Sequence, residues 1–424
     1  GHMLTYAFDL LYAIYEEALY EPSQIPSLIL SKNLFGIEID ERAAALAAFA
    51  LTMKARAKQS RFLAKASKTL PNICHLQPVT FEPRELEEYI NLQGKPLFTD
   101  EIKTLLTQFE EADNFGSLIR PVVLKDNVLR ATLQQNGVGG HLLLEHVHED
   151  VLRVLEQAEF LQRRYGVVVA NPPYMGGKGM NGRMAEWAKK NYPDSKSDLF
   201  AMFMERGFSL LTDTGFNAQV TMQSWMFLSS YEAMREKLIS RSTLDCMVHM
   251  GNGVMGIAFG TAATVFRKTY IESFTGNFSY CENDDLNEKN VPKEFPVKNA
   301  RLKQAKQDDF KKIPASPIAY WVSESVLNVF EKKSSLNDIS SVAVGLQTGD
   351  NNRFLRAWHE LDLSEVNLSG KGDRYIDDLG GKWFPYNKGG EFRKWYGNQD
   401  YLVNWKNDGK EIKNFCDENG KQRS

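Results

Sequence analysis

Short β-type runs and longer helical runs alternate along the first 270 residues of the chain. Residues 34–40 alternate apolar and polar side chains, and the alanine- and leucine-rich stretch 41–51 that follows favours a helix. The β-branched run 165–169 is typical of a buried strand. Later runs of strand character are residues 217–222, 244–250 and 261–266. This alternation of strands and helices predicts an α/β fold.

A long segment without strand character separates residues 81 and 159. Apolar residues recur there at helical spacing, first in residues 102–109 and again in residues 151–155. We therefore expect a helical insertion over about residues 81–160. A further amphipathic helix is predicted to begin at Ser197-Asp198 and to run through Leu211.

The residues that follow the run 165–169 carry most of the candidate chemistry. Pro172 and Pro173 prevent the strand from continuing, so Asn171 stands at its carboxyl end, where open α/β sheets bind ligands. An amino group on a ring is a poor nucleophile unless acceptors localise its lone pair. The carbonyl oxygens of Asn171 and Pro172 can accept its hydrogens, and Tyr174 offers a flat stacking face. A strand that ends in a Pro-Pro turn without function is the alternative.

A carboxylate ends the first predicted strand. Glu38 can accept hydrogen bonds from both ribose hydroxyls of a nucleoside cofactor, and Ile39 adjoins it. We assign Asp40 to the N-cap of the following helix, because its oxygen can accept a free backbone N–H. The alternative for Glu38 is an ordinary charge at a strand end.

With these motifs the chain resembles the amino-methyltransferases, whose fourth motif reads Asn/Asp-Pro-Pro-Tyr/Phe. Two branches share it, the DNA adenine methyltransferases and the protein glutamine methyltransferases. The resemblance implies a Rossmann-like class I methyltransferase sheet, mostly parallel with one antiparallel strand at residues 261–266, and S-adenosylmethionine as the cofactor. The implied cofactor-binding residues are Gly1, Glu38, Ile39 and Asn171, and the implied catalytic residues are Asn171, Pro172, Pro173 and Tyr174.

The beginning of the chain falls inside the first motif of this family, Asp-Pro-x-Cys-Gly-Ser-Gly-His. Gly1-His2 matches its last two residues, although the same residues could be a cloning remnant. The resemblance therefore implies a central fragment of a larger protein that lacks an interior strand and binds the donor weakly or not at all. Unpaired strand edges favour a homodimer or strand exchange. The third cofactor motif lies either at residues 73–77 or at residues 113–118, and we prefer the second.

An aromatic residue in a glycine-rich joint is the second candidate for contact with a substrate base. Residues 251–260 join the last two predicted strands, and Phe259 matches by position the aromatic that stacks on the extruded base in adenine methyltransferases. An enzyme that modifies a duplex base must flip it out and hold it between apolar faces, here Tyr174 and Phe259. A phenylalanine buried in a turn is the alternative.

Basic residues gather in the stretch that follows the Asn-Pro-Pro-Tyr motif. Residues 175–197 contain glycine and asparagine and are predicted to form a loop with a short helix. This stretch could act as a lid over a polyanionic substrate or form a solvated surface, and we weigh the two equally. The basic residues are Lys178, Arg183, Lys189, Lys190 and Lys196.

The composition changes after residue 268. Residues 272–335 are polar and contain four prolines, which predicts a connector or peripheral subdomain. Residues 342–354 and 381–396 then alternate aromatic residues with glycine and basic residues, a pattern that suits nucleic-acid contact as well as a β-rich core.

The second part of the chain extends the resemblance. It is similar to the target-recognition region of large single-chain restriction-modification methyltransferases, including type IIG enzymes, and to the PglX methyltransferases of BREX phage-defence systems. The similarity runs through nearly the whole chain. It implies a catalytic domain at residues 1–270, a connector or peripheral subdomain at 271–335 and the start of an α+β target-recognition region at 336–424.

Composition limits the remaining function classes. Hydrophobic residues make up 43% of the 424-residue chain and charged residues 25%, as in globular proteins, and no apolar run reaches membrane-spanning length. We expect a cytoplasmic protein without a membrane partner. The four cysteines are scattered, and the histidines at 141, 146 and 148 do not share one helix face, so no metal site is predicted. The net charge of -3 does not favour DNA binding unless the charges are segregated.

The resemblance thus predicts an S-adenosylmethionine-dependent N6-adenine DNA methyltransferase of a phage-defence or restriction-modification system, inactive as this truncated chain. Double-stranded DNA and other defence proteins are its expected partners. A protein glutamine methyltransferase is an alternative that leaves the aromatic and basic C-terminal segments without a purpose. A non-catalytic protein that binds DNA or partners is a second alternative. A restriction nuclease lacks support, because Asp408, Glu411 and Lys413 lie too close together in sequence.

Overall fold

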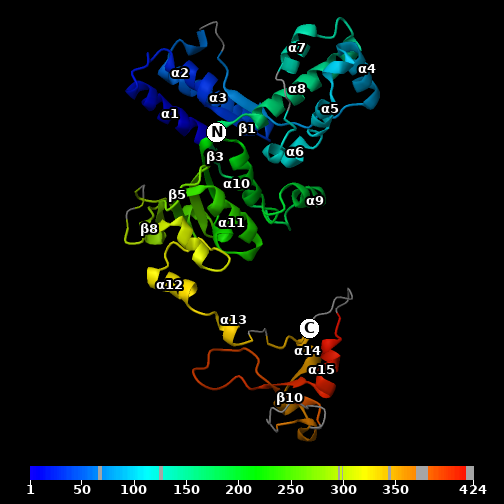
Figure 1. Ribbon diagram of the computed structural model, residues 1–424, viewed down its shortest axis with the longest axis vertical. Coiled ribbons are helices and arrows are strands. Elements are labelled where there is room, and N and C mark those ends of the chain that lie inside the picture. Colours follow the sequence, from blue (N-terminus) through cyan, green and yellow to red (C-terminus); the bar gives the residue numbers. More distant parts are fainter. Residues whose placement is uncertain are drawn as a thin grey trace. The chain divides into compact units, whose positions relative to one another are not determined.

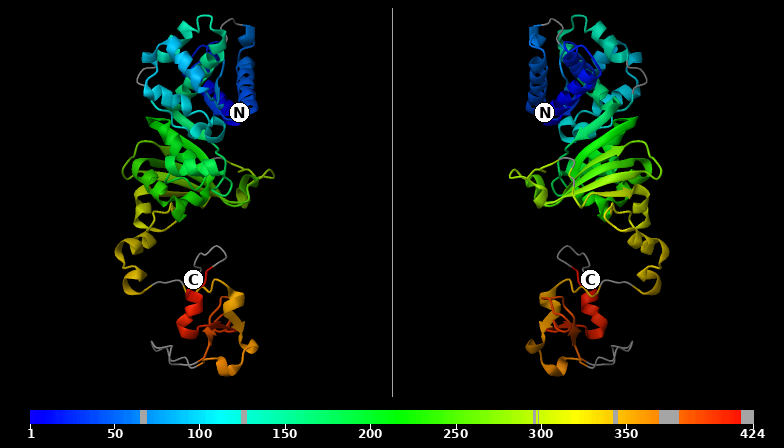
Figure 2. Two further views of the ribbon diagram at one scale, coloured as in Figure 1. Left: turned by 90° about the vertical axis from the view of Figure 1, so that its right-hand side faces the viewer. Right: turned by 90° about the vertical axis from the view of Figure 1, so that its left-hand side faces the viewer.

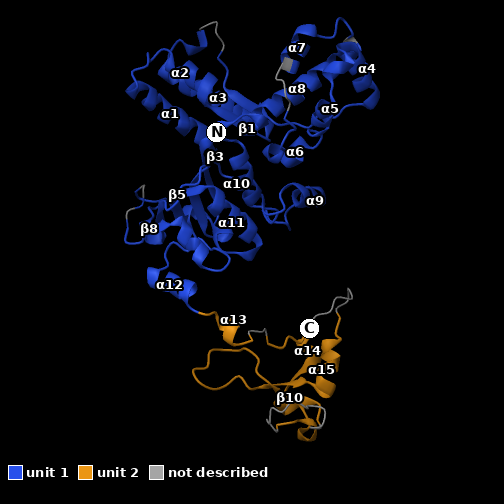
Figure 3. Cartoon of the chain, viewed as in Figure 1, with its two compact units in different colours: residues 1–333 blue, residues 334–424 orange. Residues whose placement is uncertain are grey.

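The computed structural model describes residues 1–64, 69–123, 128–294, 297, 299–341, 345–368 and 381–416. The chain divides into two compact units, Gly1–Lys333 and Ser334–Ser424 (Figure 3). Strands and helices alternate along the first unit (Figure 1), which confirms the predicted α/β class.

The first unit contains a six-stranded mixed sheet, which Figure 2 shows in green to yellow. In spatial order its strands are β3 (Tyr165–Ala170), β4 (Leu211–Met222), β6 (Thr261–Arg267), β5 (Thr243–Met250), β7 (Thr275–Cys281) and β8 (Lys303–Lys306). β6 is antiparallel to both of its neighbours, as predicted, while β3 is parallel to β4 and β7 is parallel to β5. β8 is antiparallel to β7, so the expectation of a single antiparallel strand was wrong.

The sheet continues past residue 270, into the segment for which a connector was predicted. β7 pairs with β5 and buries Phe278 in the main core. Residues 307–320 add Phe310, Ile318 and Tyr320 to the same core. The polar composition of this segment did not indicate that it contributes to the core, because the apolar residues that it buries are few and widely spaced.

A buried arginine ties residues 315–316 to the main sheet. Arg235, on α11 (Glu232–Arg241), is fully buried, and burial lowers the pKa of its guanidinium. It donates hydrogen bonds of 2.6–3.1 Å to the backbone carbonyls of Trp225, Leu228, Ala315 and Ser316. The surrounding oxygens offset the cost of burying the cation.

Two short strands form a separate parallel sheet. β1 (Phe35–Glu38) pairs with β2 (Asn72–His75), and Glu38 lies opposite His75. The helices α1 (His2–Glu17) and α3 (Glu41–Lys58) pack on each other beside this sheet. Their shared core contains Phe8, Tyr12, Ile29, Leu51 and Ala55.

The two sheets come close at β1 and β3 without pairing. The rings of Phe35 on β1 and Tyr165 on β3 lie 5.5 Å apart, yet each strand is the edge of its own sheet. On β3, Val167 and Val169 are 58% and 54% exposed, which is unusual for β-branched residues in a strand. Here the family resemblance implied that an interior strand is missing.

Helices fill the segment between β2 and β3. They are α4 (Pro83–Gln93), α5 (Asp100–Thr107), α6 (Ala112–Phe115), α7 (Val128–Asn136) and α8 (Glu145–Gln162). Apolar residues at helical spacing, such as Leu105, Leu106 and Val151, are buried in a common core. Further along, α9 (Gly182–Asn191) lies in the predicted loop, and α10 (Leu199–Ser209) ends just before β4 begins at Leu211.

The second unit contains a small antiparallel sheet. Its strands, in spatial order, are β10 (Trp383–Tyr386), β11 (Tyr401–Asn404) and β9 (Leu355–Ala357). The helices α14 (Asn351–Phe354) and α15 (Lys406–Lys413) contribute Phe354 and Ile412 to its core. Residues 342–344 and 369–380, parts of the predicted recognition region, lie outside the described residues.

Candidate active site

The Asn-Pro-Pro-Tyr motif forms a turn at the carboxyl end of β3. Pro172 is buried, whereas the side chain of Asn171 is exposed. The hydroxyl of Tyr174 donates to the carbonyl of Val220 on β4 at 3.2 Å and also lies 3.4 Å from Asn171 Oδ1. Burial raises the pKa of Tyr174, so its hydroxyl remains a donor at neutral pH. The hydrogen bond from Tyr174 to Val220 therefore holds the turn against β4, and Asn171 remains accessible at the edge of the sheet.

A buried carboxylate also holds the residue that follows this turn. Asp198 caps α10, and its Oδ1 accepts hydrogen bonds from the backbone N–H groups of Met175 at 2.9 Å and Phe200 at 3.3 Å. Burial raises the pKa of this carboxyl group. The sequence indicated only a helix start at Asp198, and its contact with Met175 depends on the return of the chain.

Two substitutions of Asp198 distinguish the contribution of its helix cap to stability from the contribution of its buried charge. Asp198→Ala should lower the free energy of unfolding by about 1–2 kcal/mol, because the cap is lost. Asp198→Asn keeps an accepting oxygen and removes a buried charge, so it should match or exceed the wild type in stability at neutral pH. A raised carboxyl pKa stabilises the fold at low pH, and this contribution is lost as the pH rises through the folded pKa.

Urea denaturation of the three proteins from about pH 7 down to about pH 4 measures this effect. The wild type should gain stability relative to Asp198→Asn as the pH falls. A wild type that instead loses stability relative to this variant towards low pH would contradict the assignment.

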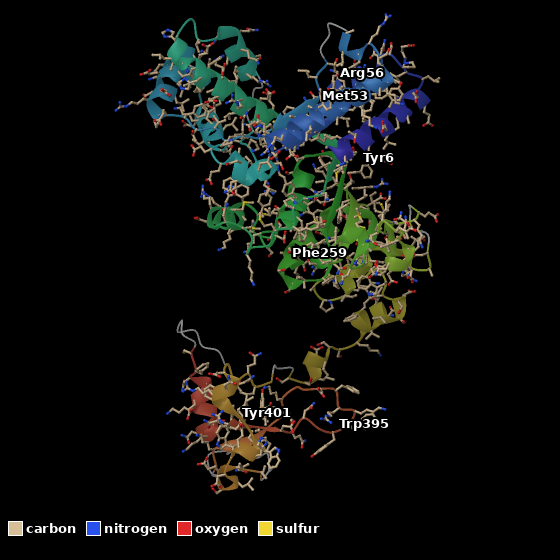
Figure 4. The ribbon with its side chains drawn as sticks, turned by 180° about the vertical axis from the view of Figure 1, so that it is seen from behind. Tyr6, Met53, Arg56, Phe259, Trp395 and Tyr401 are labelled. Atoms are coloured by element: carbon tan, nitrogen blue, oxygen red, sulfur yellow. The ribbon has the colours of Figure 1, made fainter. Side chains whose placement is uncertain are left out.

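The structure brings the two predicted stacking residues together. Phe259 lies in the joint between β5 and β6, and its ring centroid is 5.7 Å from that of Tyr174, with an interplanar angle of 66°. Phe259 is 39% exposed (Figure 4), so it is not the buried turn phenylalanine of the alternative interpretation. The two rings meet edge to face at the surface of the first unit.

Two of the predicted cofactor residues, Glu38 and Ile39, lie at the carboxyl end of β1, whereas Asn171 lies at the end of β3. Glu38 Oε1 accepts hydrogen bonds from the N–H groups of Ile39 at 2.9 Å and Asp40 at 3.2 Å. Asp40 accepts from Ala43 and caps α3, which confirms its predicted role. Gly1 directly precedes α1, and its carbonyl accepts from Thr5. Among the described residues, no hydrogen bond or ring contact joins this group to residues 171–174.

Both candidate segments for the third cofactor motif approach the end of β1. Residues 73–75 belong to β2, which is paired with β1. Gly116 has a φ of +51°, and a Cβ built on it would lie 3.2 Å from Ile39 Cδ1. Residues 113–118 therefore pack against Ile39, and the choice between the two segments stays open.

The predicted lid is anchored to the helical insertion. Asn181 caps α9 and donates a hydrogen bond to Asn114 at 3.0 Å, and Arg183 pairs with Glu111 at 2.7 Å. Trp187 of α9 stacks on Phe115 with centroids 4.4 Å apart. Arg183 is therefore engaged within the protein. The other basic residues of this stretch, Lys178, Lys189, Lys190 and Lys196, are exposed.

Two of the three histidines considered for a metal site have other partners. His146 lies 3.1 Å from Glu85, and His148 Nδ1 lies 2.7 Å from the hydroxyl of Tyr89. Within the described ranges no group of three or more His, Cys, Asp or Glu side chains could hold a metal ion. In the same ranges, the helices are too short or too polar to cross a membrane.

Comparison with known proteins adds a family and relatives. A family model described as Eco57I restriction-modification methylase matches residues 32–255. The adenine-specific methyltransferase BrxX of Escherichia coli O9:H4 (strain HS) is 41% identical over 97% of this chain and 36% of its own length. The adenine-specific methyltransferase PglX of Lacticaseibacillus casei (strain Zhang) is 35% identical over 98% of this chain and 35% of its own length. The chain thus spans about a third of the length of these curated relatives.

Among solved structures, two type ISP restriction-modification enzymes are similar at low identity. A nuclease-deletion mutant of LlaGI in complex with a DNA substrate mimic matches 77% of this chain and 24% of its own, with 12% identity and a TM-score of 0.44. LlaBIII bound to DNA matches 66% of this chain and 17% of its own, with 12% identity and a TM-score of 0.39.

Proposed function

Because the chain belongs to the Eco57I restriction-modification methylase family, we propose that it forms the catalytic part of a DNA methyltransferase that modifies N6 of adenine. The observation that carries this proposal is the surface position of Asn171 at the end of β3, beside the contact between Tyr174 and Phe259. The two curated relatives named as adenine-specific methyltransferases support the choice of base.

In this proposal, Asn171 and Pro172 orient the target amine. Their carbonyl oxygens accept its two hydrogens and localise the nitrogen lone pair for attack. The contact between Asn171 Oδ1 and the Tyr174 hydroxyl is long, and Val220 offers that hydroxyl a closer acceptor. Asn171 Oδ1 can therefore accept a hydrogen bond from the amine while the Tyr174 hydroxyl keeps its hydrogen bond to Val220.

The carboxyl end of β1 suits the adenosyl donor. Glu38 is half-buried, and its Oε1 is engaged in its own turn, which leaves Oε2 for ribose hydroxyls. Ile39 adds an apolar side chain that packs on Gly116 and borders the same edge. S-adenosylmethionine, when bound, would supply an activated methyl group on its sulfonium centre.

Methyl transfer tests this proposal directly. Tritiated S-adenosylmethionine is incubated with unmodified duplex DNA and a chain extended to the length of the curated relatives, and N6-methyladenine is measured in the digested product. An extended chain that binds the donor and DNA without forming N6-methyladenine would contradict the proposed activity.

The four exposed lysines of residues 175–197 are proposed to contact DNA phosphates. Each lysine that neutralises a phosphate releases condensed counterions, so its loss reduces the salt dependence of binding by about one unit of slope. The double variant Lys189→Ala/Lys190→Ala should therefore bind duplex DNA more weakly, with a salt slope smaller by about two.

Fluorescence anisotropy of a labelled duplex across a salt series measures this slope. Lys103→Ala, which removes an exposed lysine of α5 that pairs with Asp100, is the matched control and should leave the slope unchanged. An unchanged slope in the double variant would assign Lys189 and Lys190 to an ordinary solvated surface.

We propose that residues 336–424 begin a target-recognition region. Three aromatic side chains of this unit are 80–90% exposed: Phe392, Trp395 and Tyr396. Lys388, Arg393 and Lys394 lie beside them in sequence (Trp395 is labelled in Figure 4). Exposed aromatics among cations suit stacking on bases and contact with phosphates.

The unpaired edges of β1 and β3 are proposed to take a further strand. Within the described ranges each strand is at the edge of its sheet, and Val167 and Val169 expose apolar surface on β3. A second copy of the chain is one source of that strand, which makes a homodimer, and other phage-defence proteins are another. Sedimentation velocity of the chain alone distinguishes a dimer from a monomer.

A further inference from the structure

The loop that carries Phe259 is held at several backbone positions. At its start, the N–H of Gly251 donates to the carbonyl of Cys281 at 3.0 Å. At its end, the N–H of Gln223 donates to the carbonyl of Gly260 at 3.1 Å. Gln223 follows β4, so the loop is tied both to the β7 end and to the β4 end of the sheet.

The side chain of Gln223 fills the space next to Gly260, the residue after Phe259. A Cβ built on Gly260 would lie 2.4 Å from both Cδ and Oε1 of Gln223. Gly260 does not have a positive φ, so a glycine is required there for space and not for backbone conformation. The amide of Gln223 therefore packs directly on the backbone of the residue after Phe259.

A buried histidine holds the amide of Gln223 in this place. His249 Nε2 lies 2.6 Å from Gln223 Oε1, and His249 is only 7% exposed. Burial lowers the pKa of His249 to about 4, so the ring is neutral at pH 7 and carries a single N–H. Because Oε1 can only accept, this N–H is on Nε2, and Nδ1 is an acceptor.

A tyrosine of the main core extends this series of hydrogen-bonded side chains, Gln223 and His249, by a third member. The hydroxyl of Tyr320 lies 3.1 Å from His249 Nδ1 and, given the tautomer, donates to it. Tyr320 is buried, and its ring stacks on Phe278 of β7 with centroids 4.9 Å apart and an interplanar angle of 12°. The series Tyr320, His249 and Gln223 therefore begins at a side chain that is fixed in the core and ends at the loop that carries Phe259.

We propose that Tyr320, His249 and Gln223 form a positioning relay that seats the Phe259 loop and thereby sets the position of Phe259 against Tyr174. This inference rests on the proposed function, in which Phe259 stacks on the flipped adenine. The edge-to-face contact between Phe259 and Tyr174 leaves no room between the two rings, so a base enters only when Phe259 moves. When the base leaves, Phe259 returns to the position that the relay defines. The members of the relay are positioning residues that do not touch the base.

Fluorine NMR of 4-fluorophenylalanine placed at position 259 tests the relay in this chain, without donor or DNA. The wild type should give one resonance at a shift distinct from that of the urea-unfolded protein. Gln223→Ala and His249→Leu should split or broaden it, or move it towards the unfolded value. His249→Gln, whose amide can replace the Nε2 donor, should restore much of the wild-type spectrum.

A second label at the fully buried Phe109, in the core of the helical insertion, reports global folding. Gly260→Ala displaces the Gln223 amide while His249 and Tyr320 remain, so it should move the label at 259 and not the label at 109. An unchanged resonance at 259 in Gln223→Ala and Gly260→Ala, or equal changes at both labels in Gly260→Ala, would overturn the relay. The spectra report the seating of Phe259 whether or not methyl transfer occurs, so the two proposals fail separately.

Discussion

Replacing Asn171 with alanine is expected to lower the rate of methyl transfer to DNA by roughly 10²–10³-fold, because one of the two oxygens that orient the target amine is lost. The side chain of Asn171 is exposed, so the fold should survive the substitution. Single-turnover transfer of tritium from S-adenosylmethionine, in a chain extended to the length of the curated relatives, measures the chemical step.

Two variants make this result specific. Asn171→Asp keeps an accepting oxygen and matches the other residue that the family motif allows, so it should retain more activity than Asn171→Ala. Asn191→Ala removes an asparagine of α9 that donates to the carbonyl of Trp187, and it should transfer at the wild-type rate. A wild-type rate in Asn171→Ala would show that this oxygen does not orient the amine.

Replacing Arg235 with leucine is expected to lower the free energy of unfolding of the first unit by about 3–5 kcal/mol, the cost of breaking a buried hydrogen-bond network and leaving its acceptors unpaired. Leucine would leave the carbonyls of Trp225, Leu228, Ala315 and Ser316 without the donors that they have now. Urea denaturation followed by circular dichroism measures the loss.

Arg241→Leu is the matched control, because Arg241 is exposed on the same helix and should change stability by less than about 0.5 kcal/mol. Arg235→Lys keeps the charge but not the planar fork of donors, so it should fall between the two leucine variants. Equal stability of Arg235→Leu and Arg241→Leu would mean that residues 315–316 do not depend on this contact.

Local pattern predicted the elements that a single stretch of sequence defines. The β-branched run before Asn171 is β3, the later strand runs lie within β4, β5 and β6, and Asp40 caps α3. Helical spacing likewise located the helices between β2 and β3. These predictions succeeded because period, β-branching and capping act over a few neighbouring residues.

The hydrophobic pattern did not predict strands that contain few apolar residues. β7 depends on Phe278 and Cys281 for most of its apolar burial, and β8 lies in a Lys- and Gln-rich run with no fully buried side chain. The polar composition of residues 272–335 predicted a connector or a peripheral subdomain there. The partners of these strands, β5 and the core residues Phe310 and Tyr320, come from distant parts of the chain, so their contribution could not be seen locally.

By itself, the sequence determined the chemical identity of the candidate site: an amide and a proline carbonyl at a strand end, a tyrosine beside them and a carboxylate at the end of another strand. Only the tertiary structure decided that Arg183 pairs with Glu111 and that His249 links Gln223 to Tyr320. A motif depends on the order of neighbouring residues, whereas these contacts join segments that only the packing of sheet, helices and loops brings within a few ångströms of each other.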